Sequence, residues 1–470
     1  MFLATVVIII LFTFLALKRL DWALLVLIAS LPTYLIRFEI LGLPLTLLEG
    51  FILVAATAWF FKHFLPANKQ LLKFNFKRES GRTNYPYWRE ILLLIIISFV
   101  AVGVSGFSFG ALGIWKAYFF EPILLFLIIL NTFKDKDGYQ KILMALALSV
   151  ASVSFFAIYQ KVTGDFISNP FWAASETRRV VSFFGYPNAV GLFLAPLSIM
   201  LLGWFLSWGK EASWLKKLIL GITVLAAWAA IFFASSDGGI IAVMFGVLVM
   251  SFLYSHKSRV IILTLTLLFL ISIPVLGLHK TSLADKLQLQ DLSGEIRKQQ
   301  WRETWNMLKD GRLLMGAGLD NYQVAVRPYH QEGLFFNFDK RENFDAVVWA
   351  SPELQKIYWQ PVEIYLYPHN IILNFWSELG LLGTIIFLWL ICRAIFVSYQ
   401  TTKIPGVNNS RLKFLPLGIL SALIAIIIHG LVDVPYFKND LAVMFWIILA
   451  LGTLFELNNK QRPEELLSIK

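Results

Sequence analysis

The sequence predicts an all-α integral membrane protein with about 12 or 13 transmembrane helices and one large hydrophilic loop. Hydrophobic residues make up 58% of the 470-residue chain, whereas charged residues make up only 15%. The mean hydropathy of +0.68 lies well above that of a soluble domain. Charged residues also gather between long apolar runs, and a spanning helix needs about 20 mostly apolar residues.

Thirteen apolar runs follow one another along the chain and are the predicted spans. They cover approximately residues 2–17, 21–36, 46–62, 91–107, 113–132, 142–161, 188–207, 217–234, 239–254, 260–278, 369–392, 414–433 and 440–457. The first run has no basic segment before it and no small-residue cleavage site after it. We therefore expect a retained helix at this position and not a signal peptide.

The distribution of basic residues predicts which side of the membrane each loop faces. Of the 41 Lys and Arg residues, 24 fall in alternate loops and only 6 in the opposite short loops. The other 11 lie in the long loop, and long loops do not follow the charge rule. Because basic loops stay in the cytoplasm, we expect a cytoplasmic C-terminus and an extracytoplasmic long loop. An odd number of spans would place the N-terminus outside.

The predicted organisation has four parts: a transmembrane bundle of about ten spans (1–278), the extracytoplasmic loop (279–368), three further spans (369–457) and a cytoplasmic tail (458–470). The loop is rich in aromatic and paired charged residues, so we expect a partly helical cap packed on the bundle. A helix is predicted over 293–310, where Trp301, Trp305 and Leu308 form one apolar stripe suited to a membrane surface.

Candidate functional residues come from distant segments but converge on the predicted outer face. They are Arg178, Arg179, Asp237, Arg297, Arg302, His369, Asn370, His429 and Asp433. Arginine guanidinium groups suit a pyrophosphate, because they stay charged and donate paired hydrogen bonds to phosphate oxygens. Each arginine taken alone is better explained as a surface residue that contacts lipid headgroups, and only the occurrence of all of them on one face favours the phosphate interpretation.

His369 opens the eleventh predicted span, and Gly380 lies three helical turns further along the same stripe. Gly380 and Gly383 are three residues apart, a spacing that lets a neighbouring helix approach closely. His369 is therefore a titratable ring at the mouth of a tightly packed helix pair, or an interfacial histidine bonded to loop backbone. Glu378 in the same span is expected to face the bundle and to be paired.

Several chemistries have no support in the sequence. The outer face has no pair of carboxylates of the kind that binds a divalent metal, so no metal and no other cofactor is expected. No phosphate-binding loop for ATP occurs, and the single cysteine excludes an intrachain disulfide. The net charge of +11 reflects cytoplasmic loops and not a nucleic-acid partner.

Four segments resemble the O-antigen ligase family of bacterial membrane glycosyltransferases. The first is His369-Asn370, followed after nine residues by Gly380-Leu-Leu-Gly383-Thr384. The second is Arg179-Val-Val-Ser-Phe-Phe-Gly-Tyr-Pro-Asn188. The third is Arg297-x-x-x-Trp301 with Leu314-Met-Gly-Ala-Gly-Leu-Asp-Asn-Tyr322, and the fourth is His429-Gly-Leu-Val-Asp433. The resemblance covers roughly residues 170–435.

This resemblance implies a GT-C-like bundle in the bacterial inner membrane that acts on lipid-linked glycans of the cell envelope, such as those of lipopolysaccharide. The implied reaction moves a glycan from undecaprenyl diphosphate to an acceptor hydroxyl without a metal. Arg179 and Arg297 would bind the diphosphate and stabilise its leaving charge, with Arg178 and Arg302 beside them. His369 would orient or deprotonate the acceptor, whether glycolipid, glycan or protein. Asp237 stands where the family commonly has an arginine.

Other functions are compatible with the same features. A polymerase that lengthens the lipid-linked glycan would share the bundle and the donor. A transporter of lipid-linked glycans would need polar residues along several spans and usually has an internal repeat. The sequence shows no repeat, and its polarity gathers at one surface.

Overall fold

A computed structural model of the chain confirms the all-α integral membrane class. It describes residues 2–40, 43–64, 86–134, 137–210, 212–275, 285–286 and 288–460. Among these residues, eight helices are long and apolar enough to cross a membrane. The other predicted spans also coincide with helices, of which α1, α2 and α4 are 17, 10 and 17 residues long. The expected boundary at 278/279 and residues 461–470 of the expected tail lie outside the described residues.

The N-terminal part contains α1 (Phe2–Lys18), α2 (Leu20–Ala29), β1 (Arg37–Ile40), β2 (Leu43–Thr46), α3 (Leu47–Phe64), α4 (Trp88–Val104), α5 (Phe109–Trp115), a π-helical turn (Lys116–Phe120), α6 (Glu121–Thr132), α7 (Gly138–Thr163), α8 (Pro170–Ala173), α9 (Pro187–Ser207), α10 (Trp214–Phe233), α11 (Asp237–Tyr254) and α12 (His256–Val275). Residues 288–368, here called the cap, contain α14 (Leu292–Lys309), α15 (Tyr322–Val326), β3 (Gly333–Phe335), α16 (Phe344–Trp349), α17 (Pro352–Tyr358) and β4 (Trp359–Pro361). The chain continues through α18 (Ile371–Thr401), α19 (Phe414–Gly430) and α20 (Asn439–Lys460). The strands form two antiparallel pairs, β1–β2 and β3–β4.

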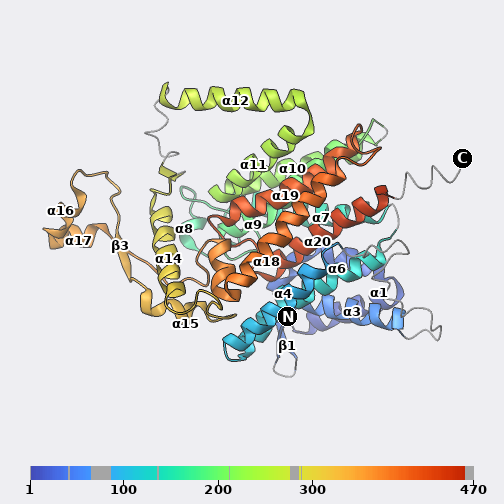
Figure 1. Cartoon of the computed structure of the whole chain (residues 1–470), viewed down its shortest axis with the longest axis horizontal. Helices are drawn as coiled ribbons and strands as arrows, with labels where there is room; N and C mark the ends of the chain where they lie inside the picture. The colour runs from blue at the N-terminus through green and yellow to red at the C-terminus, as the bar shows by residue number, and fades with distance from the viewer. Residues whose placement is uncertain are drawn as a thin grey trace, which may run out of the picture.

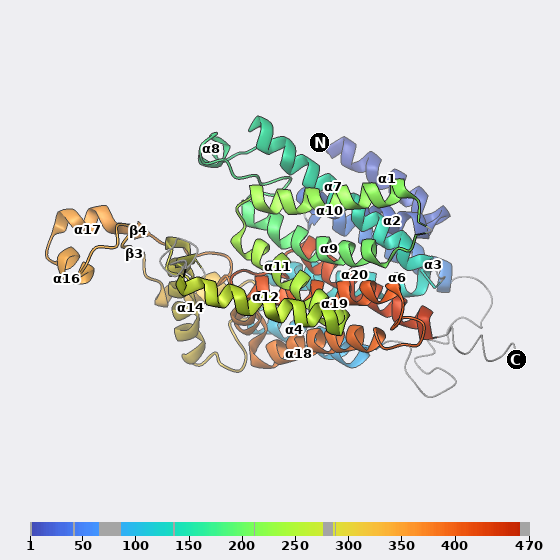
Figure 2. The same ribbon diagram turned by 90° about the horizontal axis from the view of Figure 1, so that it is seen from above.

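Most of the long helices run side by side in one bundle, and the cap lies at one end of it (Figure 1). We call this end the cap end. The pair β3–β4 with α16 and α17 projects furthest from the bundle (Figures 1 and 2). Helix α12 lies outside the main group of helices and crosses the top of Figure 1.

Helices α9, α19 and α20 form the centre of the bundle, where most of their side chains are buried. Helices α9 and α19 approach each other closely at two glycines. A Cβ added to Gly203 would lie 2.7 Å from the Cα of Gly418 and 2.6 Å from the carbonyl oxygen of Phe414. Glycine is required because a larger side chain would push the two backbones apart.

Helix α14 confirms the helix predicted over 293–310. The Asp291 carboxylate caps it by accepting a 3.2 Å hydrogen bond from the backbone N–H of Gly294. The residues of the predicted apolar stripe do not all lie in the same environment. Leu308 is fully buried in the core of the cap, whereas Trp305 is 37% exposed.

Gly380 interrupts α18, where the sequence had suggested a continuous helix face beneath His369. Its φ of +76° and ψ of 178° are readily adopted only by glycine. The segment 313–317 enters this break: the N–H of Leu381 donates to the carbonyl of Leu314 at 3.1 Å, and the N–H of Ala317 donates to that of Ser377 at 2.6 Å. The break therefore receives a loop of the cap and not a neighbouring helix.

Candidate active site

Asp433 is the central side chain of the candidate active site at the cap end. It lies between α19 and α20, is 5% exposed, and its Oδ1 accepts a 2.8 Å hydrogen bond from the N–H of Val434. The same oxygen lies 3.5 Å from Nδ1 of His369. Its Oδ2 accepts a 3.4 Å hydrogen bond from Nδ2 of Asn188. Three segments far apart in sequence therefore meet at one carboxylate.

Arg179 extends this group toward α10 and α11. Its Nη2 donates to Oδ1 of Asn188 at 3.4 Å and to the carbonyl of Ser235 at 3.1 Å. Its Nε donates to the carbonyl of Ala234 at 3.0 Å. Asn188 thus bridges a guanidinium group and the carboxylate of Asp433, using its amide oxygen for one and its amide nitrogen for the other.

Arg297 reaches the same loop from the cap. Its Nε donates to the carbonyl of Val432 at 2.9 Å, and its Nη1 donates to Oγ of Ser293 one turn earlier on α14. The neighbouring residue of Val432 is Asp433, so Arg297 fixes the backbone that carries the central carboxylate. The contact also joins the cap to the loop between α19 and α20.

The two guanidinium groups are close enough to affect each other. Burial lowers the pKa of Arg179; the carboxylate of Asp237 opposes this, and the positive charge of Arg297 adds to it. Among the described residues, no protein acceptor contacts Nη1 of Arg179 or Nη2 of Arg297. Guanidinium groups carry five N–H donors each. The site therefore presents two cations with donors free for an anion.

His369 is held in a strained backbone conformation. Its φ is +45°, a left-handed value that non-glycine residues seldom adopt. The next residue fixes it: Oδ1 of Asn370 accepts from the N–H groups of Ile372 and Leu373 and caps α18. Nδ2 of Asn370 donates to the carbonyl of Leu431 at 3.0 Å. Asn370 therefore ties the start of α18 to the end of α19 and orients His369.

Electrostatics favours the charged form of Asp433. Its burial alone would raise the pKa, but the contact with His369 and the nearby ring of His429 hold the pKa below the ordinary value for aspartate. The carboxylate consequently remains ionised at neutral pH. It is positioned to attract a proton on the facing nitrogen of His369.

His429 belongs to the last turn of α19, close to Asp433, and is 2% exposed. Two glycines make room for its ring. A Cβ on Gly238 would lie 2.7 Å from its Cδ2, and a Cβ on Gly191 would lie 3.2 Å from its Cε1. His429 therefore fills the junction of α9, α11 and α19 and supports the site from beneath.

The structure places the other predicted site residues around this group. Arg178 donates to the carbonyls of Ala173, Lys161 and Val162, so it secures the loop between α7 and α9. Asp237, at the start of α11, forms a 3.0 Å ion pair with Lys286.

Arg302 follows Arg297 by five residues on α14, which is about 140° around a helix. It lines a groove on another face of that helix. Gly380 is the break in α18 described above. Gly383 remains helical, and a Cβ there would lie 3.2 Å from Cγ2 of Ile97 on α4.

Two polar residues of this region were not singled out from the sequence. Asn188 was visible only as the last residue of a motif. Gln160 is fully buried on α7, and its Oε1 accepts from the N–H groups of Val181 and Ser182 at 3.0 and 2.6 Å. A polar residue in the last turn of an apolar span was the available signal. Gln160 fixes the segment that leads from Arg179 to Asn188.

Lys438 adds a further cation near Asp433. Its Nζ lies 5.0, 4.6 and 5.3 Å from the ring centres of Tyr34, Phe184 and Tyr186. Burial lowers the pKa of Lys438, while Asp440 and Asp433 oppose this. The three rings hold the ammonium group through cation–π contacts.

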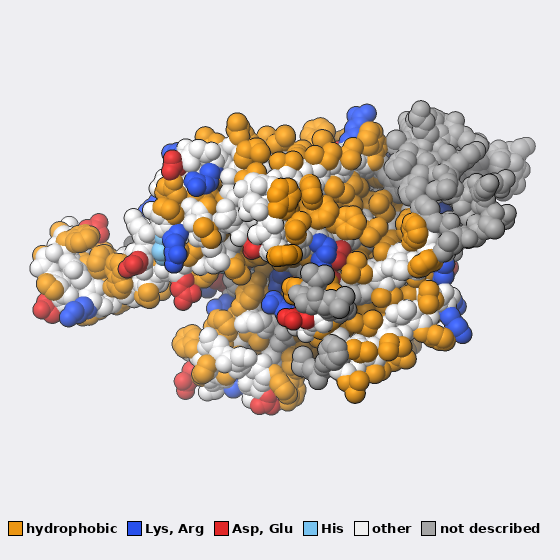
Figure 3. Space-filling model, turned by 90° about the horizontal axis from the view of Figure 1, so that it is seen from below, with side chains coloured by type: hydrophobic (Ala, Val, Ile, Leu, Met, Phe, Trp, Pro, Cys, Tyr) orange, Lys and Arg blue, Asp and Glu red, His pale blue; other side chains and the backbone are white. Residues whose placement is uncertain are grey.

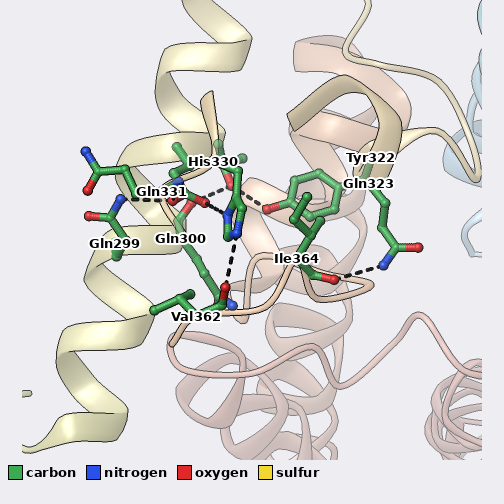
Figure 4. A network of polar contacts seen from close by, with 10 residues as sticks. Gln299, Gln300, Tyr322, Gln323, His330, Gln331, Val362 and Ile364 are labelled. Carbon is green, nitrogen blue, oxygen red and sulfur yellow. Dashed lines mark hydrogen bonds and ion pairs between the residues drawn. The ribbon is translucent and has the colours of Figure 1, made fainter. Parts of the chain in front are cut away.

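A network of polar contacts joins several segments of the cap to α14 (Figure 4). Glu303 accepts from Nε2 of Gln299 and from the N–H of Gln331, each at 2.9 Å. His330 lies between Glu303, at 3.2 Å from Nδ1, and the carbonyl of Val362, at 3.1 Å from Nε2. Because these residues come from three segments of the cap, they fix the position of α14 and so of Arg297.

The surface of the molecule seen from below has an opening on the side of the bundle. The surface seen there is hollowed near its middle, and both basic and acidic side chains lie beside the hollow (Figure 3). The bundle helices run across this view, so the hollow opens on the side of the bundle. Such an opening is suited to a ligand that arrives within a membrane.

Comparison with known proteins gives a family match over part of the chain. The sequence model of the O-antigen ligase family matches residues 221–388, from α10 into α18. A search of curated proteins finds no match. The family match includes Arg297 and His369, whereas Arg179, Asn188 and Asp433 lie outside the matched range. It covers two of the four segments that carry the resemblance, those at 297–322 and 369–384, and supports at the level of the family a membrane glycosyltransferase of the ligase-like or polymerase-like kind.

Proposed function

We propose that this membrane protein, whose residues 221–388 match the O-antigen ligase family, transfers a glycan from undecaprenyl diphosphate to an acceptor hydroxyl. The reaction takes place at the cap end of the bundle. The excess of basic residues in the opposite loops supports an extracytoplasmic position for this end in a bacterial inner membrane.

One observation carries the proposal: Arg179, Asn188, Asp433 and His369 form a continuous line of polar contacts, and Arg297 binds the backbone beside it. A diphosphate leaving group needs positive charge where negative charge develops. An acceptor hydroxyl needs a base within hydrogen-bond reach. The line offers both within one site, which is the combination that glycan transfer from a lipid diphosphate requires.

In the proposed reaction, the ionised Asp433 favours the tautomer of His369 that carries its proton on Nδ1. Nε2 is then free to take the proton of the acceptor hydroxyl. The acceptor oxygen forms a bond to the anomeric carbon of the glycan while the bond from that carbon to the diphosphate oxygen breaks. The electron pair leaves with the diphosphate, whose charge the donors of Arg179 and Arg297 stabilise.

In the proposed reaction the donor enters through the hollow on the side of the bundle (Figure 3). A polyprenyl chain stays in the membrane, so its diphosphate must reach the site from the side.

The test uses the purified full-length protein in lipid nanodiscs with an undecaprenyl-diphosphate-linked glycan and candidate acceptors. Product formation is followed by mass spectrometry of released undecaprenyl diphosphate and of the acceptor. We expect His369→Ala and Arg297→Ala to abolish both products. The matched control is Arg327→Ala, since Arg327 is an exposed arginine of the cap away from the line of contacts. Wild-type product formation by both site variants would rule out the proposed function.

The same assay separates a ligase from a polymerase. A ligase transfers the glycan to a different acceptor molecule, so the donor pool is consumed without lengthening. A polymerase lengthens the lipid-linked glycan and gives a ladder of products on undecaprenyl diphosphate.

A further inference from the structure

The part of the cap that projects furthest from the bundle carries two exposed indole rings. We call residues 333–361, which comprise β3, α16, α17 and β4, the projection. Trp349 on α16 and Trp359 on β4 are 69 and 42% exposed. These two residues are here called the tryptophan surface. In Figure 3 the projection is the lobe at the left, where hydrophobic side chains are mixed with acidic and basic ones. The tryptophan surface is separate from the line of contacts through Asp433.

The two indole rings are held in place by the residues that they pack against. The ring of Phe335 on β3 contacts both of them edge to face, with its centre 5.4 Å from that of Trp349 and 5.2 Å from that of Trp359. Gly333 lets Trp359 lie against the backbone of β3, because a Cβ at this glycine would be 2.4 Å from Cζ2 of the indole. The pairing of β3 with β4 fixes the backbone under the ring. The tryptophan surface is therefore preorganised for a ligand.

The base of the projection is joined to α14, the helix that enters the candidate active site from the cap. The N–H of Val362 donates to the carbonyl of Glu332 at 2.9 Å, next to the strand pair. His330 contacts Glu303 on α14 with one ring nitrogen and the carbonyl of Val362 with the other (Figure 4). From Val362 the chain needs seven residues to reach His369. The tryptophan surface therefore has a defined position relative to the candidate active site.

Carboxylates lie beside the exposed apolar residues of the projection. Asp345 precedes Trp349 by four residues on α16, and Glu353 precedes Ile357 by four residues on α17. This spacing places the two members of each pair on one face of their helix. Within the part of the chain that the structure describes, Asp345 has no hydrogen-bond or ion-pair partner. Glu353 accepts a 2.9 Å hydrogen bond from Oγ of Ser351. Each helix therefore presents an apolar side chain next to a hydrogen-bond acceptor.

A carbohydrate chain is the ligand whose chemistry fits this surface. A pyranose ring has an apolar face of C–H groups that packs on the face of an aromatic ring, and its hydroxyls donate hydrogen bonds to carboxylates. The core of a protein interface is instead depleted of charged residues, whereas here carboxylates lie one helical turn from exposed apolar side chains. A lipid bilayer does not fit either, because the projection lies beyond the cap and away from the spanning helices (Figures 1 and 2).

We propose that the tryptophan surface binds the glycan of the lipid-linked donor at sugars remote from the diphosphate. A diphosphate held by Arg179 and Arg297 leaves the attached glycan to extend out of the membrane and past the cap, where Trp349 and Trp359 pack against its sugars. Only a glycan long enough to reach these rings gains this contact, so the projection selects donors by the length of their glycan. This selection rests on the proposed function; the binding of a glycan to the tryptophan surface does not.

Glycan binding is tested with the full-length protein in lipid nanodiscs and the glycan released from the donor by mild acid, using isothermal titration calorimetry. We expect the wild type to bind the released glycan and Trp349→Ala and Trp359→Ala each to bind it several-fold more weakly. The matched control is Trp214→Ala, since Trp214 is 73% exposed at the start of α10, outside the projection. It should bind as the wild type does. Melting temperatures measured alongside distinguish lost binding from lost folding, and the more exposed Trp349 can be removed with the least effect on packing.

Absence of binding by the wild type, or equal binding by the wild type and both projection variants, would overturn the tryptophan surface as a glycan site. A photo-crosslinking amino acid in place of Ile357, which is 55% exposed, identifies the occupant in membranes that contain the lipid-linked donor. We expect crosslinks to the donor glycan. Crosslinks chiefly to a second copy of this chain, or to another protein, would overturn the proposal as well.

Donor selection is tested by transfer kinetics with two donors that differ only in the number of repeat units in their glycan. For Trp349→Ala we expect a several-fold higher KM for the long donor and an unchanged KM for the donor with a single repeat unit. Weaker glycan binding with an unchanged KM for both donors would overturn donor selection alone. Failure of the proposed function would instead appear as normal transfer by the Arg297→Ala and His369→Ala variants.

Discussion

Asp433 and His369 face each other at 3.5 Å, carboxylate oxygen to Nδ1, although one follows α19 and the other precedes α18. Asn370 holds the two segments together by its hydrogen bond to the carbonyl of Leu431. In the proposed reaction this relationship specifies the chemistry, because it determines which nitrogen of the ring takes the proton of the acceptor.

The first prediction concerns this pair. Asp433→Asn keeps an oxygen for the N–H of Val434 but removes the charge that selects the tautomer of His369. We expect kcat for glycan transfer to fall on the order of 10²- to 10⁴-fold, measured with saturating donor and acceptor. Asp339→Asn is the matched control, because Asp339 pairs with Arg341 in the cap and should leave kcat nearly unchanged. Equal effects of the two substitutions would contradict the role assigned to Asp433.

The second prediction separates charge from geometry at Arg297. Arg297→Lys retains one positive charge but loses the planar fork that binds Val432 and a phosphate at once. A hydrogen bond between charged groups contributes about 1.5–3 kcal/mol, which corresponds to roughly a 10- to 100-fold weaker interaction with the donor. Titration of undecaprenyl diphosphate binding measures this loss. Binding as tight as that of the wild type would show that Arg297 does not contact the diphosphate.

The third prediction is a pH dependence of stability. The pKa of Asp433 is lower in the folded protein than the unfolded value of about 3.9. Its carboxylate therefore stabilises the fold above that value, and the contribution disappears as pH falls through the lower folded pKa. Asp433→Asn should melt at a lower temperature than the wild type at pH 7, and the difference should shrink in acid. A difference of constant size from neutral to acidic pH would argue against a charged Asp433.

The fourth prediction concerns the break in α18. Gly380→Ala forces a side chain into a left-handed conformation, and the added Cβ would meet the backbone of Met315, with a separation of 2.9 Å to its Cα. We expect a loss of about 1–3 kcal/mol of stability, with easier proteolysis of the cap. Gly113→Ala serves as the control because its Cβ would meet nothing within 4 Å. Wild-type proteolysis in the Gly380 variant would mean that the segment at 313–317 does not anchor the cap.

The fifth prediction concerns metals. Positive charge for the leaving diphosphate is assigned to Arg179 and Arg297, so a divalent cation is not needed for that role. We expect the transfer rate to be the same before and after treatment with a chelator. Restoration of a lost rate by added Mg²⁺ or Mn²⁺ would assign the role to a metal instead.

The sequence by itself determined the membrane class, because long apolar runs leave no other environment for these helices. It also predicted the helix over 293–310 through its periodic pattern, which α14 confirms, and it singled out Arg179, Arg297, His369 and Asp433 through their motifs. These features depend on local composition and spacing, both of which can be read from the sequence without the structure.

Only the tertiary structure decided which of the polar residues meet. Arg178 and Arg179 are neighbours in the chain, but one binds loop carbonyls and the other binds Asn188. Gly380 suggested close helix packing, yet its left-handed conformation receives a loop from the cap. Such outcomes depend on contacts between segments far apart in sequence. No local pattern encodes the direction in which a loop side chain points, since packing against distant elements selects it.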